Sequence, residues 1–268
     1  MLLSNYTLLL CVSEKQMKFK QNKIELEQKG FSITSEIYDE NEVLEIIQTI
    51  ESIEGNSQSI IKTKELFAIR QLINVKPELW NILLNENLNE LITEIGGTNY
   101  FLTKAIYFDK PKKSNWFVSY HQDLSINVTE KSEITDYKNW TNKRNQIGVQ
   151  PPIEILENIF TIRIHLDDTT KNNGALRVIP KSHLKGIIRT DSGNYKSENE
   201  VLCELKKGES MLMKPLTLHA SSRTVNENKR RVIHLEFSNM ELEKPIKWKE
   251  MKIAERTTMA IVNTGFGA

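Results

Sequence analysis

The sequence of 268 residues contains little cysteine, with only Cys11 and Cys203, and it has no C-x-x-C motif. Two widely separated thiols argue against a disulfide framework and against a zinc site built from thiolates. Scarce cysteine without paired motifs is typical of proteins that work in a reducing compartment. We therefore expect a cytoplasmic protein.

Long hydrophobic runs are also missing. An apolar run near the start, Leu8–Val12, has no Lys or Arg before it and no small-residue cleavage site after it. It makes a poor signal peptide and is too short to cross a bilayer. Because more ordinary sequence begins at Met17, we interpret residues 1–16 as a disordered or upstream extension. Residues 17–268 are then expected to form a single domain that does not enter a membrane.

Neither sign of charge dominates the chain. The formal net charge is +1, and acidic and basic residues are mixed without a basic block or an aromatic-studded basic stripe. This pattern argues against nucleic acid as a partner. The length is sufficient to bury a sizeable core, so the composition indicates a globular protein. No feature of the sequence predicts its oligomeric state.

The distribution of apolar residues predicts helices first and strands afterwards. Asp39 and Glu42 form a capping-box pattern ahead of a helical period, and a second helix is predicted from Pro77 to Gly96. From Thr98 onward, short β-rich runs alternate with turn-forming residues, which predicts an α+β fold containing a sandwich or barrel. The predicted strands are Phe101–Phe108, Trp116–His121, Phe160–Leu166, Ala175–Ile179, Ser210–Met213, Leu216–His219 and Arg231–Phe237.

A polar insert, Glu130–Asn158, lies between the second and third of these runs. Long connections of this kind often serve as lids or substrate loops, and a solvated surface loop is an equal alternative.

Two of the five histidines begin an H-x-D motif. On a strand, side chains two residues apart project from the same face, so His121 and Asp123 can bind one metal ion. The second motif begins at His165, inside an apolar run, and its aspartate, Asp167, opens a turn. We interpret His165 as a core histidine and Asp167 as a turn cap, and we predict His121 and Asp123 as ligands.

A third ligand from a distant strand would complete a triad of two histidines and one carboxylate. Such a triad leaves positions on iron open for a bidentate cosubstrate and oxygen. The candidates are His219 and His234, whereas His183 lies in a turn and is predicted to be structural. Arg230 and Arg231 follow His219, and a guanidinium is the natural partner for the far carboxylate of 2-oxoglutarate. This favours His219.

Several short motifs occur together in a specific order, although none is specific alone. They are Gly30-Phe31, Tyr107-Phe108-Asp109-Lys110-Pro111, Tyr120-His121-Gln122-Asp123, Leu166-Asp167-Asp168, Asn173-Gly174-Ala175-Leu176, Ile179-Pro180-Lys181-Ser182-His183, His219-Ala220-Ser221 and Arg230-Arg231-Val232-Ile233-His234. Over roughly residues 28–240, the chain resembles the phytanoyl-CoA dioxygenase family on these motifs.

The resemblance implies a double-stranded β-helix, or jelly roll, with the N-terminal helices packed on one side. It also implies Fe(II) as the metal, with 2-oxoglutarate and O2 as cosubstrates. The residues that match the family's metal ligands are His121, Asp123 and His219.

The resemblance also implies a cosubstrate site. Arg230 corresponds to the arginine that pairs with the far carboxylate, and Ser221 corresponds to a residue that assists it. Lys110 and Arg163 occupy positions expected to line the pocket. Arg231 should point the other way on its strand and therefore ranks second to Arg230.

The predicted function is hydroxylation of a C–H bond of a small molecule, with release of succinate and CO2. Halogenating relatives replace the acidic ligand by Gly or Ala, so Asp123 favours hydroxylation. The alternatives are a cupin-like metalloenzyme that does not use 2-oxoglutarate and a non-catalytic ligand-binding jelly roll. A carboxylated or phosphorylated substrate is expected if Lys110, Arg144 and Arg163 face the pocket, and surface or structural roles are the alternative.

Overall fold

The computed structural model describes residues 18–54, 58–63, 67–112, 116–143, 146–189 and 199–254. The expected extension, residues 1–16, and Arg144 lie outside these ranges. Among the residues described, no helix is both long enough and apolar enough to span a membrane.

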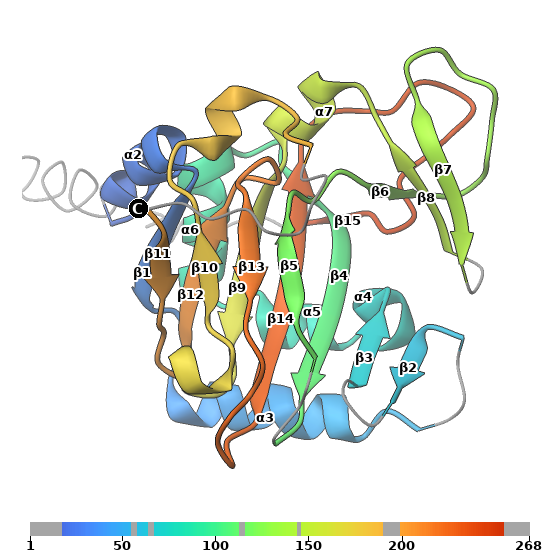
Figure 1. Ribbon diagram of the computed structural model, residues 1–268. Helices are drawn as coiled ribbons and strands as arrows, with labels where there is room; N and C mark the ends of the chain where they lie inside the picture. The colour runs from blue at the N-terminus through green and yellow to red at the C-terminus, as the bar shows by residue number, and fades with distance from the viewer. Residues whose placement is uncertain are drawn as a thin grey trace, which may run out of the picture.

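Two antiparallel sheets form the centre of the molecule (Figure 1). The large sheet contains β1 (Phe31–Glu36), β2 (Ile60–Lys62), β3 (Phe67–Arg70), β4 (Phe101–Lys110), β9 (Phe160–His165), β12 (Glu209–Met213), β14 (Arg230–Ser238) and β15 (Lys252–Ile253). The small sheet contains β5 (Val118–His121), β10 (Leu176–Val178), β11 (Val201–Cys203) and β13 (His219–Ser221). Their strand orders are β1-β12-β9-β14-β4-β3-β2, with β15 beside β4, and β11-β10-β13-β5.

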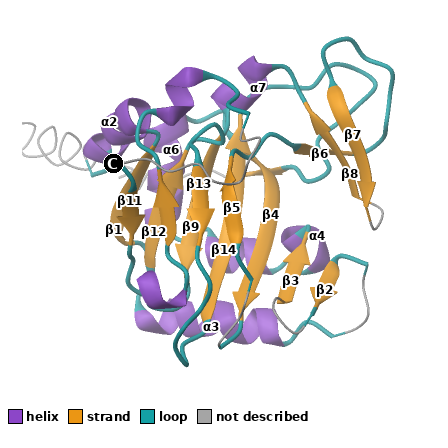
Figure 2. Ribbon diagram, in the orientation of Figure 1, coloured by secondary structure: helices purple, strands orange, loops and turns teal. Residues whose placement is uncertain are grey.

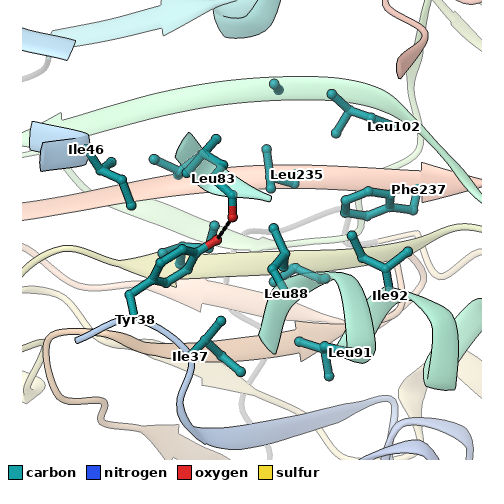
Figure 3. Close-up of a cluster of buried hydrophobic side chains, with 14 of the residues drawn as sticks. Ile37, Tyr38, Ile46, Leu83, Leu88, Leu91, Ile92, Leu102, Leu235 and Phe237 are labelled. Atoms are coloured by element: carbon teal, nitrogen blue, oxygen red, sulfur yellow. Dashed lines mark hydrogen bonds between the residues drawn. The ribbon is translucent and has the colours of Figure 1, made fainter. Parts of the chain in front are cut away.

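Helices cover the outer face of the large sheet (Figure 2). They are α2 (Lys20–Lys29), α3 (Glu40–Glu51), α4 (Leu72–Val75), α5 (Leu79–Leu83) and α6 (Glu86–Gly96). Figure 3 shows Leu88 of α6 near Leu235 and Phe237 of β14, in one buried apolar cluster. In the same cluster, the Tyr38 hydroxyl donates a hydrogen bond to the Leu83 carbonyl oxygen at 2.6 Å. The predicted packing of N-terminal helices on one side is therefore present.

Strand alternation determines which side chains face the space between the sheets. In β9, Ile162 and Ile164 join the apolar cluster under the helices, so the residues between and beyond them point to the opposite face. Arg163 of β9 pairs in register with His234 of β14, and His165 pairs with Val232. Three polar side chains, those of Arg163, His165 and His234, therefore lie on the inner face of the sheet.

The predicted helix from Pro77 to Gly96 is divided into α5 and α6. Asn85 takes an extended conformation between them, and its side chain accepts a hydrogen bond from the Leu88 backbone N–H at 2.8 Å. Asn85 is therefore the N-cap of α6. Leucines continue at helical spacing on both sides of the break, which is why periodicity alone predicts one helix.

The seven predicted strands overlap observed ones, but one is displaced. The run Leu216–His219 was expected to end at His219, whereas β13 begins there. Thr217 instead belongs to a turn, because its backbone N–H donates to the Lys214 carbonyl oxygen. The sequence prediction also omits several short strands, including β1, which pairs with β12.

The insert forms ordered structure. It contains β7 (Lys138–Lys143), β8 (Gln146–Gln150) and α7 (Ile153–Asn158), and β8 lies between β7 and β6 (Ile126–Val128). Tyr137, Val149 and Ile155 are buried in an apolar cluster with Ile246 and Trp248. The interpretation as a solvated loop is therefore wrong, and the proposed role as a lid stays a prediction.

Candidate metal centre and its cavity

Three potential metal ligands meet between the ends of two strands of the small sheet. His121 of β5 and His219 of β13 are opposite each other in register, with ring centroids 4.2 Å apart. An Asp123 carboxylate oxygen lies 3.8 Å from His121 Nε2, and the other lies 3.7 Å from His219 Nε2. Their ligand atoms all lie within 4.8 Å of one another. This donor set fits a single divalent metal ion.

Backbone contacts fix both imidazoles in the ligand form. Nδ1 of His121 lies 2.9 Å from the Ser119 carbonyl oxygen, and Nδ1 of His219 lies 2.9 Å from the Thr217 carbonyl oxygen. Because a carbonyl oxygen can only accept, each Nδ1 carries the proton and donates it. Each Nε2 therefore keeps its lone pair on the side where Asp123 lies.

The electrostatics favour the same protonation states. Burial lowers the pKa of His219 to about 4, so this imidazole is neutral at neutral pH. Burial by itself raises the pKa of Asp123, but attraction to the neighbouring imidazoles, His219 first, holds that pKa below its ordinary value. A neutral imidazole and an ionised carboxylate are the forms that bind metals.

A cavity of about 280 Å³ opens beside these donors. Residues of both sheets and of their connections line it: Arg70, Lys104, Ile106, Phe108, Trp116, Val118, His121, Asp123, Arg163, Leu176, His219, Ala220, Ser221, Arg230, His234 and Glu236. The cavity thus combines the metal donors, an apolar wall and several charged side chains.

One end of the cavity gathers hydrogen-bond donors around Gly174. The Gly174 carbonyl oxygen accepts from Arg230 Nη1 and from the Ser221 hydroxyl. Lys110 Nζ donates to the Ser222 carbonyl oxygen, and burial lowers its pKa to about 7, with Arg230 adding to the effect. Arg230 is buried, and its Nε has no partner among the described residues. The predicted cosubstrate residues Arg230, Ser221 and Lys110 therefore lie together.

Another wall of the cavity carries a chain of buried polar contacts. Arg163 Nη1 lies 2.9 Å from His234 Nδ1, and His234 Nε2 lies 3.0 Å from a Glu236 carboxylate oxygen. Lys104 Nζ donates to the same Glu236 oxygen at 2.8 Å. Arginine can only donate, so His234 Nδ1 accepts and its Nε2 carries the proton. Both ring nitrogens of His234 are thereby engaged, unlike those of His219.

Sequence reasoning missed Lys104 and Glu236. The available signal was alternation in the second half of β14, where His234 and Glu236 are polar and lie between the apolar residues Ile233, Leu235 and Phe237 of the outer face. The apolar residues alone are enough to predict the strand, so the polar residues on its inner face were not considered as part of the site.

The second H-x-D motif lies apart from the metal donors. His165 is buried, with Nδ1 2.7 Å from the Thr169 hydroxyl. Asp167 forms a bidentate ion pair with Arg231, whose Nη2 and Nε lie 2.7 and 2.9 Å from its two oxygens. The interpretation of Asp167 as a turn cap is therefore wrong. Asp168 accepts the backbone N–H of Lys207 instead.

The sequence matches a known protein family over most of its length. A family model described as phytanoyl-CoA dioxygenase matches residues 26–232. A curated relative in Dictyostelium discoideum, the phytanoyl-CoA dioxygenase domain-containing protein 1 homolog, is 24% identical over 183 residues. That match covers 62% of this chain and 56% of the relative, so the chain spans about half of the relative's length.

Solved structures share the fold at low sequence identity. The non-heme alpha ketoglutarate dependent epimerase SnoN from nogalamycin biosynthesis has a TM-score of 0.61 at 12% identity, covering 82% of each chain. HygX from Streptomyces hygroscopicus, solved with nickel, 2-oxoglutarate and hygromycin B, has a TM-score of 0.59 at 12% identity, covering 81% of this chain and 86% of that chain. The predicted α+β fold with a double-stranded β-helix is confirmed.

Proposed function

Because the chain belongs to the phytanoyl-CoA dioxygenase family, we propose that it is an Fe(II)- and 2-oxoglutarate-dependent dioxygenase that hydroxylates a C–H bond of a small molecule. The family's cofactors are Fe(II), with 2-oxoglutarate and O2 as cosubstrates. The observation that carries the proposal is the presence of a metal donor set and a buried, incompletely paired arginine in one cavity.

His121, Asp123 and His219 would hold the metal through two Nε2 atoms and a carboxylate oxygen. The proton on each Nδ1 is fixed by a backbone carbonyl, so neither ring has to reorient before it binds. When bound, iron and its cosubstrates supply the oxidation, in which one atom of O2 enters the product and the other enters succinate as CO2 is released.

Arg230, Ser221 and Lys110 would position 2-oxoglutarate by its far carboxylate. The buried Nε of Arg230 and the low pKa of Lys110 both indicate a site that an anion stabilises. A guanidinium also matches a carboxylate in planar, bidentate geometry. The apolar wall formed by Phe108, Trp116 and other lining residues restricts water around the reacting atoms.

The cupin-like metalloenzyme and the non-catalytic binding protein each fail to explain one observed feature of the cavity. A metalloenzyme that does not use 2-oxoglutarate has no use for the buried cations around Gly174. A non-catalytic binding protein has no use for two imidazoles whose free nitrogens face one carboxylate.

Anaerobic titration with Fe(II), with and without 2-oxoglutarate, separates the three functions. A visible metal-to-ligand band that requires both components is expected, together with succinate formation when O2 and a substrate panel are added. Fe(II) binding without a band that depends on 2-oxoglutarate would favour the cupin-like alternative. Absence of Fe(II) binding would favour the non-catalytic one.

A further inference from the structure

Arg163 is buried in the cavity wall and forms no ion pair with a described acidic residue. The residue is 7% exposed, and among the described residues its guanidinium donates to His234, which accepts as a neutral imidazole. Its Nε is buried and has no hydrogen-bond partner in the part of the chain that the structure describes. A buried charge that lacks a paired carboxylate is strongly destabilising, and an unsatisfied buried donor calls for an explanation.

The other charged groups in the described lining of the cavity already have partners or roles. Arg70 is exposed and donates to Gln146 Oε1 at 3.4 Å. Lys104 pairs with Glu236 at 2.8 Å, Asp123 belongs to the metal donors, and Arg230 lies at the proposed cosubstrate end. Burial lowers the pKa of Arg163, and among the described carboxylates attraction to Asp123 opposes this shift. The guanidinium therefore lies near the metal centre. Once iron and 2-oxoglutarate are bound, Arg163 would be a buried cation that still lacks an anion among the described lining residues.

A second cavity of about 480 Å³ adjoins the first, because Arg70, Lys104 and Ile106 line both. Its described lining also includes Lys143 from the β7–β8 hairpin, and it contains no Asp or Glu. A cleft lined by one sign of charge concentrates ions of the opposite sign. The route from the hairpin to the metal centre is therefore electrostatically suited to an anion.

We propose that Arg163 binds a carboxylate or phosphate group of the substrate, so that the substrate is a small anionic molecule oxidised close to its charged end. The inference rests on the proposed function, because it assigns Asp123 to the metal and Arg230 to 2-oxoglutarate. It extends that function by naming the class of substrate and the residue that selects it. The adjoining cavity would receive the rest of the molecule.

Arg163 and Arg230 line the same cavity, and the charge of Arg163 adds to burial in lowering the pKa of Arg230, but the two residues start from different positions on the sheet. Arg163 lies opposite His234, four residues along β14 from Arg230, which corresponds to roughly 13 Å of backbone at about 3.3 Å per residue. The donors that surround Gly174 lie at the Arg230 end. Binding of the far carboxylate of 2-oxoglutarate by Arg163 is the competing role, and the experiment distinguishes it.

The test uses the full chain, labelled with ¹⁵N and loaded with diamagnetic Zn(II) and 2-oxoglutarate. Acetate, inorganic phosphate and neutral acetamide are titrated separately while the Arg163 Nε–H signal is followed, assigned by its loss in Arg163→Gln. We expect saturable movement of this signal with acetate or phosphate and none with acetamide. Whichever anion binds more tightly distinguishes a carboxylate from a phosphate site. Absence of saturable movement with both anions would overturn the proposal.

Calorimetry on two variants assigns the effect to Arg163. Arg163→Gln should weaken binding of the preferred anion by about 30-fold or more, which corresponds to about 2–5 kcal/mol for truncating one partner of a buried charge pair. It should leave 2-oxoglutarate affinity within about threefold of wild type. The control is Arg231→Gln, because Arg231 faces away from the cavity and pairs with Asp167. That variant should bind the anion as wild type does.

Failure of the inference differs from failure of the proposed function. Equal anion affinity in wild type and Arg163→Gln would reject the inference. A larger loss of 2-oxoglutarate than of acetate or phosphate in Arg163→Gln would also reject it and assign Arg163 to the cosubstrate. If the wild-type metal-loaded protein does not bind 2-oxoglutarate at all, the proposed function fails instead, and the same titrations without 2-oxoglutarate still decide whether Arg163 binds anions.

Discussion

At the scale of single residues, the site depends on which nitrogen of each histidine is free. His121 and His219 each donate Nδ1–H to a carbonyl oxygen two residues earlier, so their Nε2 atoms are free. His234 uses both nitrogens within the polar chain. Three histidines near one cavity are therefore distinguished by hydrogen bonding, which also separates the two candidates for the distal ligand.

The first prediction concerns the choice between the two H-x-D motifs. His121→Ala and His219→Ala should each weaken Fe(II) or Mn(II) binding by more than about 100-fold, because each removes a direct ligand. His165→Ala should keep full metal stoichiometry, since His165 contacts Thr169 instead. Metal content after desalting, with Mn(II) titration, measures both. Full binding in the His121 variant together with loss in the His165 variant would show that the wrong motif was chosen.

The second prediction concerns the pH dependence conferred by Lys110. Burial, with Arg230 adding to it, lowers the pKa of Lys110 to about 7, so the side chain is protonated below that pH and loses its charge above it. A bound carboxylate favours the protonated form. The affinity for 2-oxoglutarate should therefore be highest below about pH 7 and fall by up to about tenfold per pH unit above it.

Calorimetric titration of the Mn(II)-loaded protein across this range measures the slope. Lys110→Met should bind 2-oxoglutarate more weakly at pH 7 and lose most of the slope. His219 should not interfere, because in the Mn(II)-loaded protein its Nε2 would be bound to the metal and could not take up a proton. An unchanged slope in Lys110→Met would mean that another group titrates with binding.

At the scale of elements, alternation along β14 separates two neighbouring arginines. Arg230 is buried on the inner face beside Gly174, whereas Arg231 pairs with Asp167 on the other side. A shift of one residue in register would exchange these roles, because successive side chains on a strand face opposite sides. The function of this strand therefore depends on the pairing of β14 with β4 and β9.

The third prediction concerns the break between α5 and α6. Asn85 accepts the Leu88 N–H at 2.8 Å and donates to the Ile37 carbonyl oxygen and to Glu42 Oε1, both at 2.9 Å. Asn85→Ala removes the N-cap hydrogen bond and the two hydrogen bonds to Ile37 and Glu42. The free energy of unfolding should fall by about 2 kcal/mol in chemical denaturation.

Asn89→Ala, one turn further along α6, serves as the matched control. Asn89 lies within the helix, and its side chain forms no hydrogen bond with another described residue. Its substitution should change stability by less than about 0.5 kcal/mol. Similar losses in both variants would mean that the loss at Asn85 does not come from its capping hydrogen bonds.

At the scale of the whole molecule, two layers create the site that neither contains alone. The small sheet supplies His121 and His219, and the large sheet supplies Arg163, Arg230 and the polar chain. The helices bury the outer face of the large sheet, which leaves its inner face for polar groups. The insert adds Lys143 of β7 to the adjoining cavity and therefore contributes to its lining.

Much of this organisation follows from the sequence because local patterns are strong. Features formed by residues close together in the chain were predicted correctly. Examples are the capping box at Asp39 and Glu42 and the motif His121-Gln122-Asp123. The break at Asn85 was missed because leucines continue across it. The partner of Asp167 was missed because Arg231 is distant in sequence. Contacts between strands require the register, which a single sequence does not specify.

The central claim is that the cavity binds 2-oxoglutarate through Arg230 beside a metal held by His121, Asp123 and His219. Calorimetric titration of 2-oxoglutarate into the Mn(II)-loaded protein tests it most directly, with wild type, Arg230→Ala and Arg231→Ala compared. Arg230→Ala should lose about 30-fold or more in affinity, which corresponds to about 2–5 kcal/mol for an unpaired buried charge, and retain Mn(II) binding. Arg231→Ala should keep the affinity and lose stability, because its partner is Asp167. A larger loss in Arg231→Ala, or no loss in either variant, would contradict the account.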